Sequence, residues 1–276
     1  MTLSKIGIWT SYRQIGEANA AVAARLAEEL GVVFWLGGSP HLPDLRPLLE
    51  ATQHLVVATG IVNVWQNEPA DVAAQFAQLE ADFPGRVLVG IGIGHPEATS
   101  DYTRPLTTMR AFLDGLDGAV APLPADRRCL AALGPKMLDL AAARSAGTHT
   151  YFVPVDHTRA TRERIGADAL LATELACVLD DNTERARGAA RSYAAMYLGL
   201  RNYTGNLLRH GFTEQDLADG GSDRLIDAIV PHGAPERIAA VAREHLSAGA
   251  DHVCLQPVGV QGVPQEEWTA LAAALE

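Results

Sequence analysis

Three glycines and a histidine at the end of one apolar run are the first candidates for chemistry. The run 87–89 is followed by Gly90, Gly92 and Gly94, which alternate with isoleucines, and then by His95. Because glycine weakens a strand, this pattern predicts that another group approaches the backbone closely. His95 follows the carboxyl end of the predicted strand, where parallel α/β folds bind ligands. The alternative interpretation is a buried strand with a glycine-rich exit turn and a surface histidine.

A second candidate is the turn Leu133-Gly134-Pro135-Lys136. Pro135 suits the first position of a helix, and the N–H groups and dipole at a helix N-terminus favour an anion. Lys136 adds positive charge where a helix prefers an acid. We therefore expect an oxyanion here, most simply a phosphate. The alternative is an ordinary turn with a solvated lysine.

Other chemical motifs are missing from the sequence. Glu97 stands where a dinucleotide-binding G-x-G-x-x-G pattern would carry its last glycine, so a nicotinamide site is not expected. There is no P-loop, no G-x-S-x-G elbow and no H-E-x-x-H pair. Cys129, Cys177 and Cys254 lie far apart in apolar runs, which predicts buried free thiols and no metal site.

Length and charge narrow the class of protein. The 276 residues suit one (β/α)8 barrel, which takes roughly 250 residues. The formal net charge of −11 argues against nucleic acid and anionic membranes as partners. Neither a membrane span nor a signal peptide is expected. Together with the free thiols, these features predict a cytoplasmic protein that acts on a small molecule.

Eight apolar segments alternate with helical segments along the chain. The expected strands are residues 5–10, 32–36, 55–61, 87–92, 128–133, 150–153, 174–179 and 252–257. This alternation predicts a parallel sheet, and the number eight favours closure into a barrel. Residues 202–234 break the rhythm with short, turn-rich pieces, so we expect an insertion over the mouth of the barrel. No linker divides the chain, which predicts a single domain over 1–276.

Four phrases, in this order and spacing, resemble the luciferase-like monooxygenase superfamily and its branch that uses the deazaflavin coenzyme F420. They are Ala58-Thr59-Gly60-Ile61, the helix phrase from Pro69 to Arg86, the run 89–94, and residues 131–137. The resemblance implies a (β/α)8 TIM barrel with an insertion near its C-terminal end. It also implies an oxidoreductase whose flavin-like ring lies across the barrel mouth.

The resemblance further implies site residues. A cis peptide at Gly60-Ile61 would support the back of the ring, and the turn 133–136 would hold the cofactor phosphate. His95 matches the place of a catalytic glutamate in F420-dependent sugar-phosphate dehydrogenases, so we predict that it exchanges a proton. The expected cofactor-binding residues are Trp35, Gly60, Ile61, Asn63, Gly92, Gly94, Leu133, Gly134, Pro135 and Lys136.

Aromatic and polar residues near strand ends are candidates for the substrate pocket. Besides Trp35, these are Trp9, His41, Trp65 and Tyr102. A second group beside the insertion has two interpretations, as lid residues or as the packing face of a helix: Tyr193, Tyr197, Arg201 and Tyr203.

Three functions fit this sequence. The leading hypothesis is a homodimeric enzyme that transfers a hydride between F420 and a small organic substrate. The alternatives are an FMN-dependent luciferase-like monooxygenase and a non-catalytic flavin-binding barrel. Titration with F420 and FMN side by side separates the first two.

Overall fold

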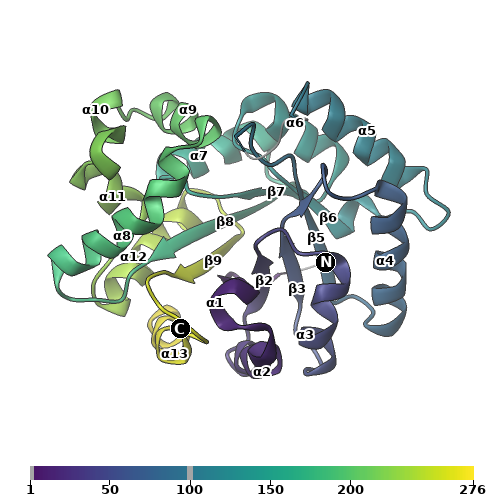
Figure 1. Cartoon of the computed structure of the whole chain (residues 1–276), viewed down its shortest axis with the longest axis horizontal. Coiled ribbons are helices and arrows are strands. Elements are labelled where there is room, and N and C mark those ends of the chain that lie inside the picture. Colours follow the sequence, from purple (N-terminus) through teal and green to yellow (C-terminus); the bar gives the residue numbers. More distant parts are fainter. Residues whose placement is uncertain (1–2, 98–101) are drawn as a thin grey trace.

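The chain forms a closed barrel of parallel strands wrapped by helices in the computed structural model, which describes residues 3–97 and 102–276 (Figure 1). The strand order is β3-β2-β1-β9-β8-β7-β6-β5-β4, and pairing of β3 with β5 closes the barrel. The strands are β1 (Ile6–Thr10), β2 (Val33–Gly37), β3 (Val57–Gly60), β4 (Val62–Asn63), β5 (Val87–Gly92), β6 (Arg128–Ala131), β7 (Gly147–Thr150), β8 (Leu170–Cys177) and β9 (His252–Pro257). β3 and β4 both pair with β5 and are two parts of one strand interrupted at Ile61, so the barrel has eight strands and the expectation of a (β/α)8 barrel is confirmed.

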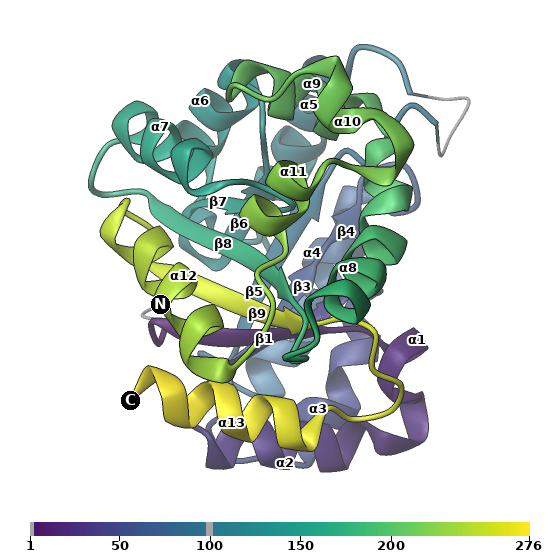
Figure 2. The same cartoon turned by 90° about the vertical axis from the view of Figure 1, so that its left-hand side faces the viewer.

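Helices cover the outside of the barrel (Figures 1 and 2). Proline opens four of them, at Pro69, Pro105, Pro135 and Pro235, because its fixed φ suits the first helical position and its missing N–H is not needed there. The α-helices are α1 (Tyr12–Ile15), α2 (Ala20–Glu29), α3 (Arg46–Glu50), α4 (Pro69–Asp82), α5 (Pro105–Asp117), α6 (Pro135–Arg144), α7 (Val155–Ile165), α8 (Thr183–Leu198), α9 (Arg201–Arg209), α10 (Glu214–Leu217), α11 (Asp223–Ile229), α12 (Pro235–Ser247) and α13 (Gln265–Leu275). Short 3-10 helices occupy Glu17–Asn19, Leu42–Leu45, Ala125–Arg127 and Ala218–Gly220.

The strands bury both of their faces, as parallel strands do. On β2, Phe34 and Leu36 pack outward among helix side chains, whereas Trp35 packs into the barrel interior. Cys129 and Cys254 join this interior cluster, and Cys177 is buried against the helices on the outside. All three thiols are free and buried, as the sequence predicts.

The glycines of β5 allow β3 to approach it. A Cβ atom on Gly90 would lie 2.0 Å from the carbonyl oxygen of Thr59, and a Cβ on Gly92 would lie 2.6 Å from Cδ1 of Ile61. Thr59 Oγ1 also donates a hydrogen bond to the carbonyl of Gly90. The close neighbour predicted from the glycine pattern is therefore the third strand and its bulge.

Strand limits in the second half of the chain differ from the prediction. β7 ends at Thr150, where the predicted strand 150–153 begins, and β8 starts at Leu170, before the predicted 174–179. The β7 sequence Gly-Thr-His-Thr is polar. His149 stacks on Trp35 in the barrel interior, while Thr148 and Thr150, on the opposite face, hydrogen-bond to Leu130 of β6 and Thr173 of β8. Hydropathy therefore favoured the apolar residues that follow. Phe152, with φ of 56°, turns the chain away from the sheet.

Residues 202–234 are mostly helical, with α9, α10 and α11 standing beside α8 (Figure 2). Tyr203 and Leu207 of α9 and Leu225 of α11 share an apolar cluster with α8. Arg187 of α8 also bridges Asp223 and Asp227, each at 2.6 Å. These contacts hold α9 and α11 against α8.

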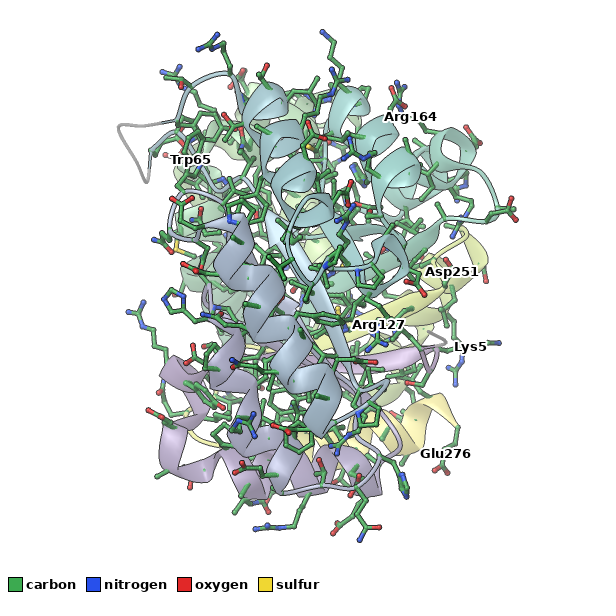
Figure 3. All side chains as sticks on the ribbon, turned by 90° about the vertical axis from the view of Figure 1, so that its right-hand side faces the viewer. Lys5, Trp65, Arg127, Arg164, Asp251 and Glu276 are labelled. Carbon is green, nitrogen blue, oxygen red and sulfur yellow. The ribbon has the colours of Figure 1, made fainter. Side chains whose placement is uncertain are left out.

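The two ends of the barrel carry different residues. Figure 3 shows Trp65, which follows β4, on one side of the molecule, and Lys5 and Asp251, which precede β1 and β9, on the opposite side. Helices in the described ranges are too short or too polar to cross a membrane.

Candidate active site

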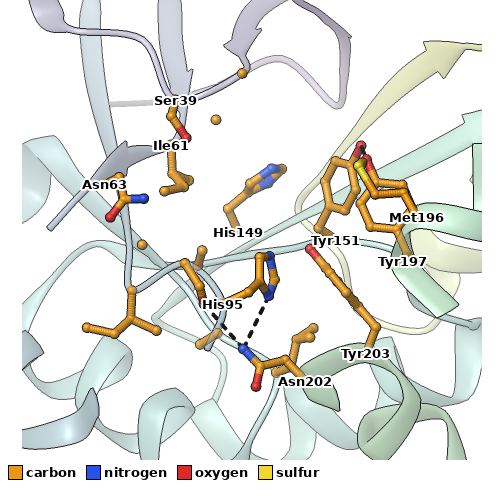
Figure 4. Close-up of a pocket in the computed structure, with 18 of the residues that line it drawn as sticks. Ser39, Ile61, Asn63, His95, His149, Tyr151, Met196, Tyr197, Asn202 and Tyr203 are labelled. Carbon is orange, nitrogen blue, oxygen red and sulfur yellow. Dashed lines mark hydrogen bonds between the residues drawn. The ribbon is translucent and has the colours of Figure 1, made fainter. Parts of the chain in front are cut away.

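A cavity of about 790 Å³ opens at the carboxyl ends of the strands. This volume is in the range that holds a cofactor or a drug-sized ligand. Its wall comes from the carboxyl-terminal ends of the strands other than β8, from the segments that follow them, and from helices α8 and α9. Figure 4 shows His95 and His149 projecting into it, with Tyr151 and Tyr197 together on one side.

Most of the predicted site residues meet at this cavity. The lining includes Gly60, Ile61, Asn63, Gly92, Gly94, His95, Leu133 and Gly134. Three predicted residues are absent from it. Trp35 is fully buried below the cavity, where its Nε1–H donates to His252 Nε2 at 2.9 Å. Pro135 and Lys136 lie outside the lining, and the side chain of Lys136 is exposed.

The peptide Gly60-Ile61 is cis, as the sequence analysis expects. The indole of Trp9 packs against this bulge, since a Cβ on Gly60 would lie 2.6 Å from Trp9 Nε1. Ile61 faces the cavity (Figure 4).

Of the four other candidates for the substrate pocket, two line the cavity and two do not. Trp9 and Tyr102 line the cavity. Trp65 does not line the cavity, and its Nε1–H donates to the carbonyl of Ile93 at 2.6 Å. His41 also lies elsewhere, paired with Asn67 at 3.0 Å.

His95 is held by α9. The amide nitrogen of Asn202 lies 3.3 Å from His95 Nδ1 and 3.3 Å from the carbonyl of Gly94 (Figure 4). Since the amide N–H donates to Nδ1, the ring proton is on Nε2. Burial lowers the pKa of His95 below its usual 6.5, so the imidazole is neutral at pH 7. His95 is therefore a hydrogen-bond donor through Nε2–H.

The charged side chains on the described cavity wall are arginines: Arg13, Arg201 and Arg209. Neither aspartate nor glutamate is among the described lining residues. This contrasts with the net charge of −11 for the whole chain. Low-dielectric walls with one sign of charge concentrate the field, so this mouth favours an anion.

The turn before α6 offers backbone donors to that anion. Gly134 is the N-cap, and the first N–H groups of a helix lack partners within the helix. A Cβ at Gly134 would meet nothing within 4 Å, so the turn is open on the cavity side. Arg209 of α9 lines the same cavity as Gly134 and is the cation available to that anion, whereas Lys136 is exposed and does not line the cavity. The residues present fit a phosphate.

A buried cluster of phenols forms another part of the wall. Tyr151 Oη lies 2.9 Å from both Tyr193 Oη and Tyr197 Oη, and it donates to Gln256 Oε1 at 2.8 Å. Behind them, Tyr193 Oη lies 3.4 Å from Glu174 Oε1. Burial raises the pKa of Glu174 from 4.5 to about 8 and the pKa of Tyr151 well above 10. Burial therefore favours the neutral form of each of these groups.

The residues with two interpretations in the sequence all line the cavity. Tyr193, Tyr197 and Tyr203 also pack in the apolar cluster of α8 and α9, as the packing interpretation expects. Arg201 is exposed.

His149 lies on the cavity wall, stacked on Trp35 with 4.2 Å between ring centroids. Neither of its ring nitrogens has a hydrogen-bond partner among the described residues. Burial lowers its pKa to about 3, so the ring is neutral. In the described part of the chain, no group of His, Cys, Asp and Glu is arranged to hold a metal ion.

Sequence reasoning missed several residues of this site. Tyr151 is the first residue after β7, but the predicted strand 150–153 placed it inside the sheet. Glu174 is a lone acid in the apolar strand β8, which is a signal for a buried functional group. Asn202 and Arg209 carry no such signal, because only the fold of α9 brings them to the cavity.

The fold and the cavity define a (β/α)8 barrel with a ligand-sized pocket at the carboxyl ends of its strands, and the sequence comparisons identify its family. The chain belongs to the luciferase-like monooxygenase family, whose model matches residues 1–252. This is a family of enzymes, so the chain is an enzyme.

Individual relatives are similar over different lengths. An F420-dependent glucose-6-phosphate dehydrogenase from Microbacterium testaceum (strain StLB037) is 30% identical over 113 residues, which is 36% of this chain and 33% of that protein. A 5,10-methylenetetrahydromethanopterin reductase from Methanolobus tindarius is 25% identical over 86% of this chain and 89% of that protein. The first of these matches therefore spans only a third of its relative.

Solved structures share the fold. An F420-dependent secondary alcohol dehydrogenase, solved with an F420-acetone adduct, superposes with a TM-score of 0.78 at 17% identity, covering 100% of both chains.

Proposed function

We propose that this protein is an F420-dependent oxidoreductase that transfers a hydride between the deazaflavin and a small organic substrate. The observation that carries the proposal is the arginine-lined cavity, which ends at the open turn of Gly134. A long anionic cofactor needs both a wide mouth and an anchoring point for phosphate. The F420-dependent activities named for the relatives favour F420 over FMN.

The residues divide between the two ends of the cofactor. Gly60 and Ile61 would support the ring, and the backbone N–H groups at Gly134 would bind the phosphate with help from Arg209. When bound, the deazaflavin supplies or accepts the hydride, and the protein supplies position and a dry pocket. Trp35, Pro135 and Lys136 have no direct place in this arrangement.

His95 would hydrogen-bond the reacting substrate through Nε2–H. Asn202 fixes the ring for this task, since it holds Nδ1. We further propose a homodimeric, cytoplasmic enzyme of one domain over 1–276, with 202–234 as an insertion over the mouth.

An absorbance assay tests this function. Purified protein is mixed with oxidised F420 and a panel of primary and secondary alcohols, or with reduced F420 and the matching carbonyl compounds. We expect a change in the F420 absorbance with at least one pair. Oxygen consumption with reduced FMN, in place of any F420 turnover, would support the monooxygenase instead.

A further inference from the structure

Tyr203 differs from the other tyrosines of the cavity wall in the state of its hydroxyl group. The hydroxyls of Tyr193 and Tyr197 each lie 2.9 Å from that of Tyr151, so these three phenols are partners of one another. The hydroxyl of Tyr203 makes no hydrogen bond with a residue in 3–97 or 102–276. Its Oη is not among the fully enclosed polar atoms of these ranges, so it opens onto the cavity that Tyr203 lines.

The ring of Tyr203 is held in place by other aromatic rings. Tyr203 is 7% exposed, and it packs edge-on against Phe152 and Tyr197, with ring centroids 5.6 and 5.2 Å away. A buried phenol usually donates its hydrogen to a partner, because an unpaired polar group is costly away from water. Since the described part of the protein offers none, we expect a ligand to provide the partner.

His95 lies beside this hydroxyl. The ring centroids of His95 and Tyr203 are 5.2 Å apart, and Figure 4 shows both side chains directed into the same part of the cavity. Asn202 occupies Nδ1 of His95, which leaves the Nε2–H free to donate to a ligand. Two consecutive residues in the first turn of α9 therefore act on this point: Asn202 fixes His95, and Tyr203 adds a second donor beside it.

We propose that Tyr203 is a substrate-binding residue whose O–H donates to the same substrate oxygen as the Nε2–H of His95. An oxygen atom has two lone pairs, so it can accept both hydrogen bonds. An ammonium group does not fit, because His95 has no free lone pair to offer it. Burial raises the pKa of Tyr203 well above 10, so the phenol keeps its hydrogen. The bound oxygen then lies on the α9 side of the cavity, across from Ile61 (Figure 4).

This inference rests on the role proposed above for His95, but its first test needs neither cofactor nor substrate. Tyr203→Phe keeps the packed ring and removes only a hydroxyl that has no partner in the described protein. We therefore expect the Tm of Y203F to be no lower than that of the wild type, because no hydrogen bond within the protein is lost.

Tyr197→Phe is the matched variant for that measurement. Tyr197 belongs to the same apolar cluster as Tyr203, but its hydroxyl is paired with that of Tyr151. We expect Y197F to melt below the wild type, because Tyr151 loses a partner. A Tm for Y203F as low as that of Y197F would show that the Tyr203 hydroxyl has a structural partner, and it would overturn the proposal.

The second test compares two probes of the same shape. Cyclohexanone carries an oxygen where methylenecyclohexane carries a CH2 group, and both are titrated by ligand-observed NMR into protein with oxidised F420, which has no hydride to give. We expect the preference for cyclohexanone to fall about fivefold in Y203F, the usual worth of one neutral hydrogen bond. Tyr12→Phe is the control, since Tyr12 Oη donates to the carbonyl of Asp44 away from the cavity.

The double variant tests whether one oxygen receives both hydrogen bonds. The preference for cyclohexanone is measured in H95A, in Y203F and in the protein that carries both changes. Donors to a single atom depend on each other, so the loss in the double variant should differ from the product of the single losses by at least about twofold. Losses that multiply would show two separate contacts and would overturn the shared oxygen.

The affinity for F420 separates this inference from the proposed function. If the wild type and Y203F bind F420 equally and have the same ratio of Kd values for the two probes, Tyr203 has no role in binding and the proposed function stands. If the wild type does not bind F420, the proposed function is wrong. The Tm comparison and the same titrations without cofactor would then still decide the role of Tyr203.

Discussion

At the scale of single residues, His95 is the side chain that joins the sequence prediction to the geometry. It reaches the cavity as expected, and Asn202 fixes its tautomer. We predict that His95→Ala lowers turnover by about 10²- to 10³-fold, because a preorganised donor to a developing oxyanion is lost. The affinity for F420 should change little. Steady-state kinetics with a carbonyl substrate and a separate F420 titration check both parts.

The pH profile of His95 has a definite sign. Burial holds its pKa below 6.5, so the neutral ring persists at mildly acidic pH. Protonation of Nδ1 would break the hydrogen bond from Asn202, so wild-type turnover should fall as pH drops through this pKa. His54→Ala is the control, since His54 is exposed and outside the cavity lining. If His54→Ala lowered turnover as much as His95→Ala does, His95 would have no special role.

Gly134 provides the second residue-scale prediction. A side chain here meets nothing of the protein within 4 Å, so Gly134→Val should leave the fold intact and block the approach of a phosphate to the backbone. Hydrogen bonds to a charged group contribute about 1.5–3 kcal/mol each, so the Kd for F420 should rise at least tenfold. Isothermal titration calorimetry measures this change.

Gly188→Val is the matched variant for that titration. Gly188 also has open space around its Cβ position, but it lies on the exposed side of α8. Its Kd for F420 should equal the wild-type value. A Gly134→Val protein that still binds F420 normally would mean that the phosphate lies elsewhere.

At the scale of elements, the contact between β3 and β5 closes the barrel. Gly90 has no room for a side chain, because a Cβ would lie 2.0 Å from the backbone oxygen of Thr59. We predict that Gly90→Ala lowers the free energy of unfolding by about 1–3 kcal/mol, as overpacking of a close contact does. Denaturant unfolding measures this difference. Gly134→Ala should change stability little, and a similar loss in both variants would contradict the closure argument.

The sequence predicts elements well where patterns of apolar residues and prolines coincide. The strand predicted over 87–92 matches β5 at both ends, and α6 begins at Pro135 as the turn predicts, since a buried parallel strand and a proline at a helix start have strong local signals. The prediction of β7 fails because Thr148, His149 and Thr150 are all polar, on both faces of the strand. A hydropathy pattern does not identify a strand whose side chains are polar.

The sequence predicts site residues well where it also predicts the strands that carry them. Gly60, Gly92 and His95 follow well-marked strands, and all reach the cavity. The sequence favours Lys136 for its charge and position, but its side chain is exposed and does not line the cavity. Arg209 of α9 lines the cavity instead, more than seventy positions later in the chain, and only tertiary packing brings it there.

At the scale of the whole molecule, charge is distributed unevenly. The chain carries a net charge of −11, while the charged side chains of the described cavity wall are arginines. The bulk of the surface therefore repels anions, and the mouth attracts them. This contrast favours a long anionic cofactor over an uncharged ligand, and it explains how an acidic protein can bind one.

Direct binding of the cofactor decides whether this barrel is an F420 enzyme. F420 and FMN are titrated into the purified wild-type protein at the same pH and ionic strength, with heat or fluorescence as the signal. We expect one F420 site per chain with a Kd at least tenfold below that for FMN. Binding of FMN alone, or of neither cofactor, would contradict the assignment.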